Sequence, residues 1–289
     1  MSKKFSIVVP VYENKNGLKS FIEEINSIKN SITPDFEFIF VDDGNDYEID
    51  DCIKLENVDF KVIKNSRNAG YGFSIKRGVE KSLGKLVGII DCDSTYDLKD
   101  LIDKFIGFDL DKNDLLVGKR NFLFKDFFLR VKYRNLINFI TSYLFKYKVE
   151  DLNSGIRIFK KNDFLENINF FPDQFSLTST QTLITIASNK NLSYFSTNYK
   201  KRSGNSKINI LIDPFKFIIL ILKVFLIFFP TKFFGYTGLI FILISFLLLV
   251  YSFLFMSQIL DLTILILFIA GINFIFFGLL AEILKFYKK

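Results

Sequence analysis

The sequence predicts an α/β domain with a largely parallel sheet, followed by an interfacial helix and a hairpin of two transmembrane helices. In the first 115 residues, short β-rich runs alternate with amphipathic helical patterns, which is typical of βαβ folds. Further along, residues 233–260 and 262–281 contain no charged side chain. A helix needs about 20 apolar residues to cross a bilayer, so both stretches are long enough.

Each element of the sheet can be read from its pattern. Strands are expected at residues 5–12, 36–43, 60–65 and 85–91, and helices at 17–30 and 72–83. In parallel sheets of this kind, ligands bind at the carboxyl ends of the strands. Acidic residues collect at these ends, namely Glu13, Asp42, Asp43, Asp91 and Asp93.

Asp91 and Asp93 are predicted to bind a divalent metal ion. Neither a Gly-x-Gly-x-x-Gly fingerprint nor a GxxxxGK[ST] loop stands at these strand ends, so phosphates must be held in another way. The two aspartates follow an apolar strand, where burying unpaired carboxylates without a cation would be costly. Asp109 and Asp111 have the same spacing but follow no apolar run, and we interpret them as solvated.

The composition excludes several kinds of chemistry. The chain has no His, no Trp and two Cys. It therefore holds no Ser-His-Asp relay, no His-containing zinc site and no disulfide framework. Any reaction must use carboxylates, cations, hydroxyl groups or a bound metal.

Charge is divided unevenly along the chain. Residues 1–115 contain 16 Lys and Arg against 22 Asp and Glu, residues 116–213 contain 16 against 7, and residues 214–289 contain 6 against 2. The three parts thus carry −6, +9 and +4, which gives the total of +7. The basic part is expected to meet anions, either a phosphorylated substrate or lipid headgroups. Nucleic acid is disfavoured, because no long Lys/Arg run has interleaved aromatic residues.

The membrane part is predicted at residues 233–289, with spans at 233–256 and 262–284. Two buried core helices are the competing interpretation, but runs so rich in Leu, Ile and Phe would leave a soluble protein no polar face. Lysines flank the outer ends of the spans: Lys216, Lys223, Lys232, Lys285, Lys288 and Lys289. The turn between the spans contains no Lys or Arg, so both ends are expected on the cytoplasmic side.

Residues 208–232 are expected to form a helix that lies on the inner leaflet. Lys216 and Lys223 are seven residues apart and share one face of an otherwise apolar helix. A third span is the alternative, which these lysines and Pro230 disfavour. The N-terminus has no apolar signal-peptide core, so residues 1–213 are expected in the cytosol with free thiols. Assembly of the hairpins into a homo-oligomer stays open.

Five segments in order resemble the family 2 glycosyltransferases of GT-A fold. They are VVPVYEN, FVDDGN, NAGYGFSIKRGVEKSLGKLVGIIDCD, EDLNSGIRIF and KKRSGNSKI. The resemblance is greatest to the polyprenyl-phosphate sugar synthases, the group of dolichol-phosphate mannose synthase and bacterial undecaprenyl-phosphate glucosyltransferases. It implies a GT-A domain at 1–207, with a nucleotide-binding half at 1–115 and an acceptor half at 116–207. It also implies a nucleotide-sugar donor, a polyprenyl phosphate acceptor and Mg2+ or Mn2+.

The resemblance also implies roles for matching residues. Nucleotide-sugar binding falls to Pro10, Tyr12, Glu13, Asp42, Gly70 and Asp91. Metal binding falls to Asp91 and Asp93, and catalysis to Asp93, Asp151 and Arg157. Acceptor or phosphate binding falls to Arg120, Arg130, Arg134, Ser154, Arg202, Ser206 and Lys207. The sequence departs from the group at Thr95, where relatives often have Gln, at Asn153, where they have Thr, and at Asn138, where they have Ser.

Several of these residues have a structural alternative. Asp151 could be a helix N-cap or the partner of Arg157. Tyr12 could be a packed aromatic residue, and Gly70 could only shape a turn. The basic residues at 130, 132 and 134 could form the face of a helix that lies on anionic lipid.

A phosphate acceptor would suit a chain without histidine. The second pKa of a phosphate monoester is about 6, so the nucleophilic oxygen is already ionised near neutral pH. We therefore expect transfer of one hexose from a UDP- or GDP-sugar to a polyprenyl phosphate, with inversion. A glycan or glycolipid hydroxyl acceptor, with Asp151 as base, is the alternative. A non-catalytic scaffold that keeps the fold is another, and a chain polymerase is disfavoured because its Q-x-x-R-W element needs Trp.

Overall fold

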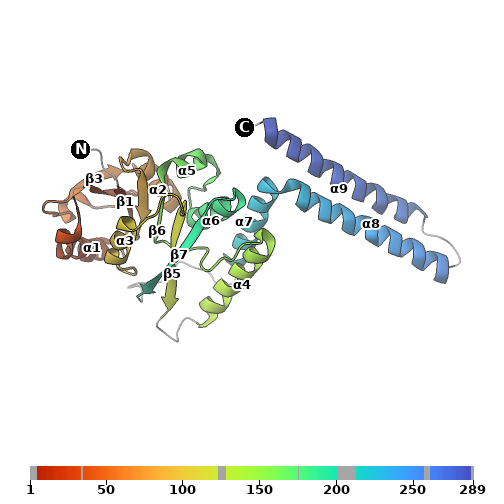
Figure 1. Ribbon diagram of the computed structural model, residues 1–289, viewed down its shortest axis with the longest axis horizontal. Helices are drawn as coiled ribbons and strands as arrows, with labels where there is room; N and C mark the ends of the chain where they lie inside the picture. Colours follow the sequence, from red (N-terminus) through yellow and green to blue (C-terminus); the bar gives the residue numbers. More distant parts are fainter. Residues whose placement is uncertain are drawn as a thin grey trace. The chain divides into compact units, whose positions relative to one another are not determined.

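The computed structural model describes residues 5–33, 35–122, 128–174, 176–200, 213–256 and 261–287. The chain divides into two compact units, Met1–Ile221 and Leu222–Lys289. The first contains a mixed sheet with helices and the second a helical hairpin (Figure 1). The α/β class and the hairpin expected from the sequence are both confirmed.

A seven-stranded sheet in the order β3-β2-β1-β4-β6-β5-β7 forms the centre of the first unit. Its strands are β1 (Phe5–Val11), β2 (Phe36–Asp42), β3 (Asp59–Lys64), β4 (Leu86–Ile89), β5 (Leu115–Phe122), β6 (Arg157–Lys160) and β7 (Leu192–Tyr199). Among these described strands, β6 alone runs antiparallel to its neighbours. Its start therefore lies at the sheet edge where the other strands end.

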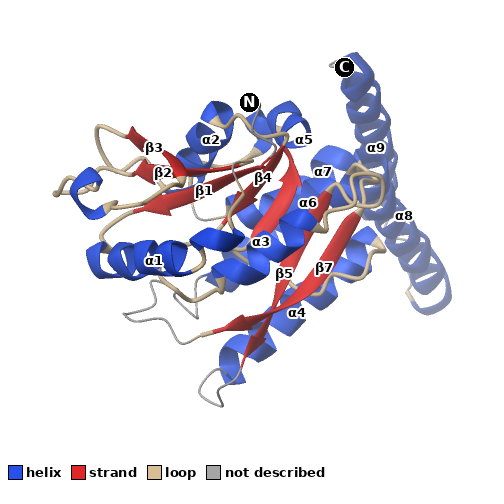
Figure 2. Cartoon of the chain, turned by 60° about the vertical axis from the view of Figure 1, so that its left-hand side comes forward, coloured by secondary structure: helices blue, strands red, loops and turns tan. Residues whose placement is uncertain are grey.

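Helices cover both faces of this sheet, with α1 on one side of β1 and α2 on the other (Figure 2). The helices of the first unit are α1 (Lys15–Ser27), α2 (Tyr71–Lys81), α3 (Leu98–Ile106), α4 (Phe128–Phe145), α5 (Lys161–Glu166) and α6 (Leu177–Ala187). In α1, the Asn14 side chain caps the first turn by accepting from Gly17 N at 3.1 Å. The residues that α1 buries have helical spacing: Leu18, Phe21, Ile22 and Ile25.

The core explains why the strand patterns could be read from the sequence. All seven residues of β2 are buried, as expected for an inner strand of a sheet covered on both faces. Phe5, Phe36 and Phe105 pack with ring centroids 4.8–5.5 Å apart. Helix α6 is buried at every one of its 11 positions, although five of them carry a hydroxyl and one an amide. Those polar side chains need partners, and the candidate site supplies several of them.

Helix α7 (Asp213–Phe228) crosses the division between the units, and Pro230 then opens α8 (Pro230–Phe255) at its first turn. Helix α9 (Asp261–Tyr287) follows. Pro230–Phe255 and Asp261–Lys285 are each long and apolar enough to cross a membrane. In each, 17% of the most apolar window is buried, whereas the core helix of a soluble protein would be mostly buried. This favours lipid as the environment of the hairpin.

Small residues on one face of α8 bring the two helices of the hairpin together. A Cβ added to Gly238 would lie 2.6 Å from Gly271 O, so both backbones approach closely where these glycines meet. Seven residues on, the buried Ser245 hydroxyl donates to Ile264 O at 2.9 Å. Thr231 donates to Glu282 at 3.0 Å, which shows that the helices run antiparallel. The close packing of the two helices buries the hydroxyl groups of Ser245 and Ser252.

Candidate active site

The predicted site residues meet at one edge of the sheet. Asp91 and Asp93 follow the carboxyl end of β4, and Arg120 lies near the end of β5. The reversed strand β6 pairs its first residue, Arg157, with both Ile89 and Val117. The loop that precedes β6, residues 151–156, is therefore held next to the ends of β4 and β5.

Gly155 brings this loop against Asp91. A Cβ at position 155 would lie 2.7 Å from Asp91 Oδ2, so only glycine allows the carboxylate this close to the main chain. The Tyr96 hydroxyl accepts from Gly155 N at 3.0 Å and contacts Ser154 Oγ at 3.4 Å. Burial raises the pKa of Tyr71 and of Tyr96, and the nearby Asp91 carboxylate adds to it in both. Both phenols are therefore neutral near pH 7.

Asp93 is oriented by its own loop. It is buried, and its Oδ1 accepts from Thr95 N at 3.1 Å and from Thr95 Oγ1 at 2.6 Å. Thr95 therefore fixes one oxygen of the aspartate. Asp91, by contrast, is partly exposed at the strand end.

The donor set at this edge fits a magnesium-type ion. Within the described parts of the chain, no three His, Cys, Asp or Glu side chains gather into a metal-binding group. Mg2+ is commonly held by one or two carboxylates together with substrate phosphates rather than by a complete protein cage. Asp91 and Asp93 therefore suit an ion whose remaining ligands come from a bound diphosphate.

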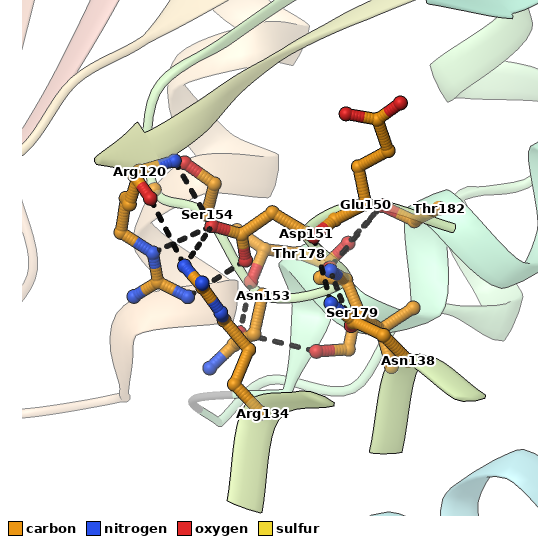
Figure 3. A network of polar contacts seen from close by, with 12 residues as sticks. Arg120, Arg134, Asn138, Glu150, Asp151, Asn153, Ser154, Thr178, Ser179 and Thr182 are labelled. Atoms are coloured by element: carbon orange, nitrogen blue, oxygen red, sulfur yellow. Dashed lines mark hydrogen bonds and ion pairs between the residues drawn. The ribbon is translucent and has the colours of Figure 1, made fainter. Parts of the chain in front are cut away.

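Asp151 lies in a cluster with two arginines (Figure 3). Its side chain is wholly buried. Arg120 donates to both carboxylate oxygens, from Nε and from Nη2, at 2.8 Å each. Arg134 Nη1 lies 3.7 Å from Asp151 Oδ2 and donates to Arg120 O at 3.0 Å. The sequence alternatives for Asp151, an N-cap or a partner of Arg157, do not describe these contacts.

The cluster keeps Asp151 ionised and carries one positive charge in excess. Burial alone would raise the pKa of Asp151, but Arg120 and Arg134 outweigh it, and the pKa is lowered. Burial lowers the pKa of Arg134, partly offset by Asp151. An ionised carboxylate with a lowered pKa and a bidentate cation is a poor proton acceptor. The arrangement can instead offer guanidinium groups to an anion.

Arg157 is oriented inward, toward α6. It is wholly buried, and its Nη1 donates to Thr178 O at 2.7 Å and to Gln181 Oε1 at 3.2 Å. Its Nε donates to Ser154 O at 3.2 Å. Burial lowers the pKa of Arg157 to about 10, so it is charged at neutral pH. Because its partners are the protein's own oxygens, Arg157 holds the 151–156 loop in place.

Two asparagines complete the support of this loop. Asn153 Oδ1 accepts from Thr178 Oγ1 at 2.7 Å and from Ser179 Oγ at 3.1 Å. Asn138 Nδ2 donates to Glu150 O at 2.7 Å. Both amides therefore have structural roles.

Asp42 is engaged with a neighbouring loop at the first two strands. Its Oδ1 accepts from Asn45 N at 2.9 Å and from Asn45 Nδ2 at 2.6 Å. Asn45 also donates to Val11 O at 2.9 Å and accepts from Glu13 N at 2.7 Å. Through Asn45, the carboxylate of Asp42 fixes the chain that leaves β1, next to the partly exposed Pro10 and Tyr12.

Asp43, for which only a place at the strand end was predicted, anchors the loop that leads into α2. Its two oxygens accept from Asn65 Nδ2, Ala69 N and Gly70 N at 2.8, 2.9 and 3.0 Å. Gly70 has φ of 106°, and a Cβ there would lie 2.5 Å from Asp173 O. A turn-shaping role for Gly70 therefore has a physical basis.

Some predicted residues lie outside the described part of the chain. Arg202, Ser206 and Lys207 fall in residues 201–212, and the side chain of Arg130 is likewise not described. Sequence reasoning gave no role to Asn45, Tyr71 and Tyr96. A signal was available for Tyr71, which stands between two glycines in one of the recognised segments, whereas Tyr96 lies three residues beyond the end of that segment.

A family model for Glycosyl transferase family 2 matches residues 6–168, more than half of the chain. The chain belongs to this family. The glycosyltransferase is 24% identical over 163 residues to a dodecaprenyl-phosphate galacturonate synthase of Rhizobium johnstonii, covering 55% of this chain and 48% of that protein. It is 27% identical over 143 residues to a dolichyl-phosphate beta-glucosyltransferase of Dictyostelium discoideum, covering 41% and 44%. The matched regions span less than half of either relative.

Solved structures share the fold of this glycosyltransferase. Glucosyl-3-phosphoglycerate synthase of Mycobacterium tuberculosis, in complex with Mn2+, UDP and glucosyl-3-phosphoglycerate, has a TM-score of 0.59 at 13% identity. That match covers 77% of this chain and 80% of the other. TarS of S. aureus in complex with UDP-GlcNAc has a TM-score of 0.55 at 21% identity, covering 77% and 66%. The predicted resemblance to polyprenyl-phosphate sugar synthases and the GT-A fold are thus confirmed.

Proposed function

We propose that this glycosyltransferase moves one hexose from a UDP- or GDP-sugar to a polyprenyl phosphate, with inversion and with a divalent metal ion. The observation that carries the proposal is the Arg120–Asp151–Arg134 cluster. It places a net positive charge beside the Asp91 edge and leaves Asp151 unsuited to deprotonate a hydroxyl group. An acceptor that arrives ionised fits such a site better than one that must lose a proton.

In this mechanism the residues of the chain position two anions. A phosphate oxygen of the acceptor attacks C1 of the sugar, the C1–O bond to the nucleotide breaks, and the nucleoside diphosphate leaves with the bonding electrons. One displacement inverts the configuration at C1. Arg120 and Arg134 would orient the acceptor phosphate and screen its repulsion from the diphosphate. Asp151 and Arg157 would act as positioning residues, the first for Arg120 and the second for the loop at Ser154.

Asp91 and Asp93 would hold Mg2+ or Mn2+, which supplies charge neutralisation to the donor diphosphate when bound. The fold likeness to a synthase solved with Mn2+ and UDP supports this choice. Pro10, Tyr12, Glu13, Asp42 and Gly70 would line the nucleotide side. Arg202, Ser206 and Lys207, with Arg130, would contribute further phosphate contacts.

The membrane hairpin supports a lipid acceptor. Two helices long and apolar enough to span a bilayer follow the catalytic unit, and two relatives carry the names of polyprenyl- or dolichyl-phosphate enzymes. With Lys232 before the first span and Lys285 after the second, the catalytic unit would face the cytoplasm. In this proposal the chain keeps the domain limits predicted from the sequence, 1–207, 208–232 and 233–289.

The test is a transfer assay with the full-length protein in detergent. Polyprenyl phosphate is supplied with UDP- and GDP-hexoses in turn, with Mg2+ or Mn2+, and the lipid fraction is examined by mass spectrometry. A lipid-linked hexose, formed with one donor and lost on adding a chelator, is expected. If every donor fails with the lipid phosphate while a glycan or glycolipid hydroxyl is glycosylated, the proposed acceptor is wrong.

A further inference from the structure

Tyr199, the last residue of β7, lies where the two sides of the candidate site meet. β7 runs parallel to β5, and the register places Tyr199 opposite Phe122, two residues beyond Arg120 (Figure 2). The chain therefore leaves β7 at the sheet edge at which Arg120 lies. No role was predicted for Tyr199, because it stands just before the last segment that resembles the family.

The ring of Tyr199 contacts Arg120 on the acceptor side. The Cζ atom of Arg120 lies 5.6 Å from the centroid of the ring, which is within the range of a cation–π interaction. Asp151 holds the same guanidinium group through Nε and Nη2. Arg120 is thus held by a carboxylate and by an aromatic ring, and the ring also contacts the donor side.

On the donor side, the partner of Tyr199 is the metal loop, which we define as residues 91–96. The ring packs edge-on against Tyr96, with centroids 5.2 Å apart and an interplanar angle of 68°. Tyr96 is buried, and its hydroxyl group accepts from Gly155 N. The main chain adds a second connection, because Lys200 N donates to Thr95 O at 2.9 Å. The end of β7 is therefore fixed to the metal loop by a ring contact and by a hydrogen bond.

The conformation of the metal loop depends on such support. Ser94 has φ of 55°, in the left-handed region that residues other than glycine rarely adopt and that persists where the surroundings enforce it. The next residue, Thr95, binds Asp93 through its N–H and hydroxyl groups and accepts from Lys200 N through its carbonyl oxygen. A displacement of the end of β7 would therefore reach the carboxylate of Asp93 through one residue.

We propose that Tyr199 is a positioning residue that couples metal binding at Asp91 and Asp93 to phosphate binding at Arg120. The inference rests on the proposed function, which assigns the metal ion to the two aspartates and the acceptor phosphate to the arginine. An ion that fixes the metal loop also fixes the ring against Arg120, so the phosphate then has less order to impose. Direct attraction between the two ligands adds to the coupling, but it does not depend on Tyr199.

The coupling can be measured without sugar transfer, because a coupling between two binding sites is reciprocal. Full-length protein in detergent is titrated with Mn2+ alone, and free Mn2+ is followed by electron paramagnetic resonance. The titration is repeated with undecaprenyl phosphate in the micelles, and with undecaprenol as the control that lacks the phosphate. Micelles that contain the lipid phosphate and no protein correct for Mn2+ bound by the lipid. The ratio of the Kd values without and with the phosphate is the coupling factor.

Two variants of Tyr199 and one matched control separate coupling from packing. Tyr199→Leu removes the ring, whereas Tyr199→Phe keeps it. The control is Phe195→Leu, which removes a ring from the same face of β7, four residues earlier. Phe195 belongs to the hydrophobic core and packs against Gly118. Its loss should lower the unfolding temperature without changing the coupling factor, and all titrations are made below the unfolding temperature of each variant.

Undecaprenyl phosphate is expected to lower the Kd of the wild type for Mn2+ by about fivefold. The factor should fall to about twofold or less in Tyr199→Leu, and stay near the wild-type value in Tyr199→Phe and Phe195→Leu. The proposal is overturned if the wild type shows no coupling or if Tyr199→Leu keeps the full factor. It is also overturned if Phe195→Leu loses the factor equally, since Tyr199 would then contribute only packing.

The outcome can be told apart from that of the transfer assay. A coupling factor that behaves as expected, in a protein that transfers no hexose to the lipid phosphate, would contradict the proposed function and not the role of Tyr199. Transfer that proceeds in a protein without coupling would contradict the role of Tyr199 alone.

Discussion

The two halves of the catalytic unit treat buried carboxylates in opposite ways. In the acidic half, Asp42 and Asp43 accept hydrogen bonds from amide groups of Asn45, Asn65 and the main chain. In the basic half, Asp151 is bound by two guanidinium groups. Neutral donors stabilise a carboxylate without cancelling its charge, whereas arginines do cancel it. The first half therefore stays negative at the sheet edge and suits a cation, and the second stays positive and suits an anion.

The largest expected effect is on the acidic side. Asp93→Asn keeps the size of the side chain but removes the charge that would hold the metal ion. We expect transfer to fall about 1000-fold, equivalent to about 4 kcal/mol of lost transition-state stabilisation. Asp111→Asn is the matched control, because Asp111 is the exposed second aspartate of the other Asp-x-Asp pair and the change removes the same charge. Initial rates at saturating donor and metal measure both. Equal rates for the two variants would contradict the assignment of Asp93.

The next effect concerns the ion pair of the basic side. Asp151→Asn leaves Arg120 and Arg134 together without their carboxylate, and the free energy of unfolding should drop by about 3 kcal/mol. Denaturation of the full-length protein in detergent measures it. The double variant Arg120→Met, Asp151→Leu should lose less than Asp151→Asn alone. A larger loss in the double variant would show that the pair adds net stability.

The same pair predicts a pH dependence. The pKa of Asp151 is lowered in the folded protein, below its usual value of about 3.9. The stabilisation is therefore fully present above pH 3.9 and is lost as the pH falls through the lower, folded value. The difference in unfolding free energy between the wild type and Asp151→Asn should shrink in acid. A difference that stays constant from pH 7 to pH 3 would refute the lowered pKa.

The acceptor side should separate from the donor side in kinetics. Arg134→Gln is expected to raise the KM for polyprenyl phosphate by about tenfold, with little change in the KM for the nucleotide sugar. Lys148→Gln removes a neighbouring positive charge from an exposed side chain and should leave both values near the wild type. If Arg134→Gln instead raises the KM for the donor, the assignment of acceptor binding to the basic half is wrong.

The smallest effect tests the connection between the halves. Tyr96→Phe removes the hydroxyl group that accepts from Gly155 N and contacts Ser154. A buried N–H left without its partner costs about 1 kcal/mol. We expect a decrease in kcat of several-fold together with a raised metal requirement, because Gly155 adjoins Asp91. A titration of activity with metal ion distinguishes a raised metal requirement from a general loss of stability. If the titration is unchanged, Tyr96 contributes only packing.

Elements that depend on local side-chain patterns could be predicted from the sequence, whereas elements that depend on long-range strand pairing could not. The strands at β1 to β4, and α1 and α2, follow from local patterns and were predicted within a few residues of their observed limits. β6 was not, because its direction is set by pairing with β4 and β5, which a periodicity of side chains does not encode. Asp91 and Asp93 could be singled out for the same local reason, since they directly follow a buried strand.

The partner of Asp151 could not be found in this way. Arg157 is six residues away and was the partner considered from the sequence, whereas Arg120 lies 31 residues earlier in the chain. The choice depends on α6, whose buried hydroxyl and amide groups take the guanidinium of Arg157. The residues around Asp151 in the sequence do not indicate that a helix beginning at Leu177 will bury polar side chains.

The reversed strand β6 also has a consequence for how the protein is made. It completes the middle of the sheet, yet its residues 157–160 leave the ribosome after those of β1 to β5. Until then β4 has an unpaired edge, and such edges promote association between nascent chains. The glycosyltransferase is thus most exposed to misassembly in the interval between synthesis of β4 and of β6. The apolar hairpin is synthesised after that interval has closed, which keeps the two aggregation-prone parts of the chain apart in time.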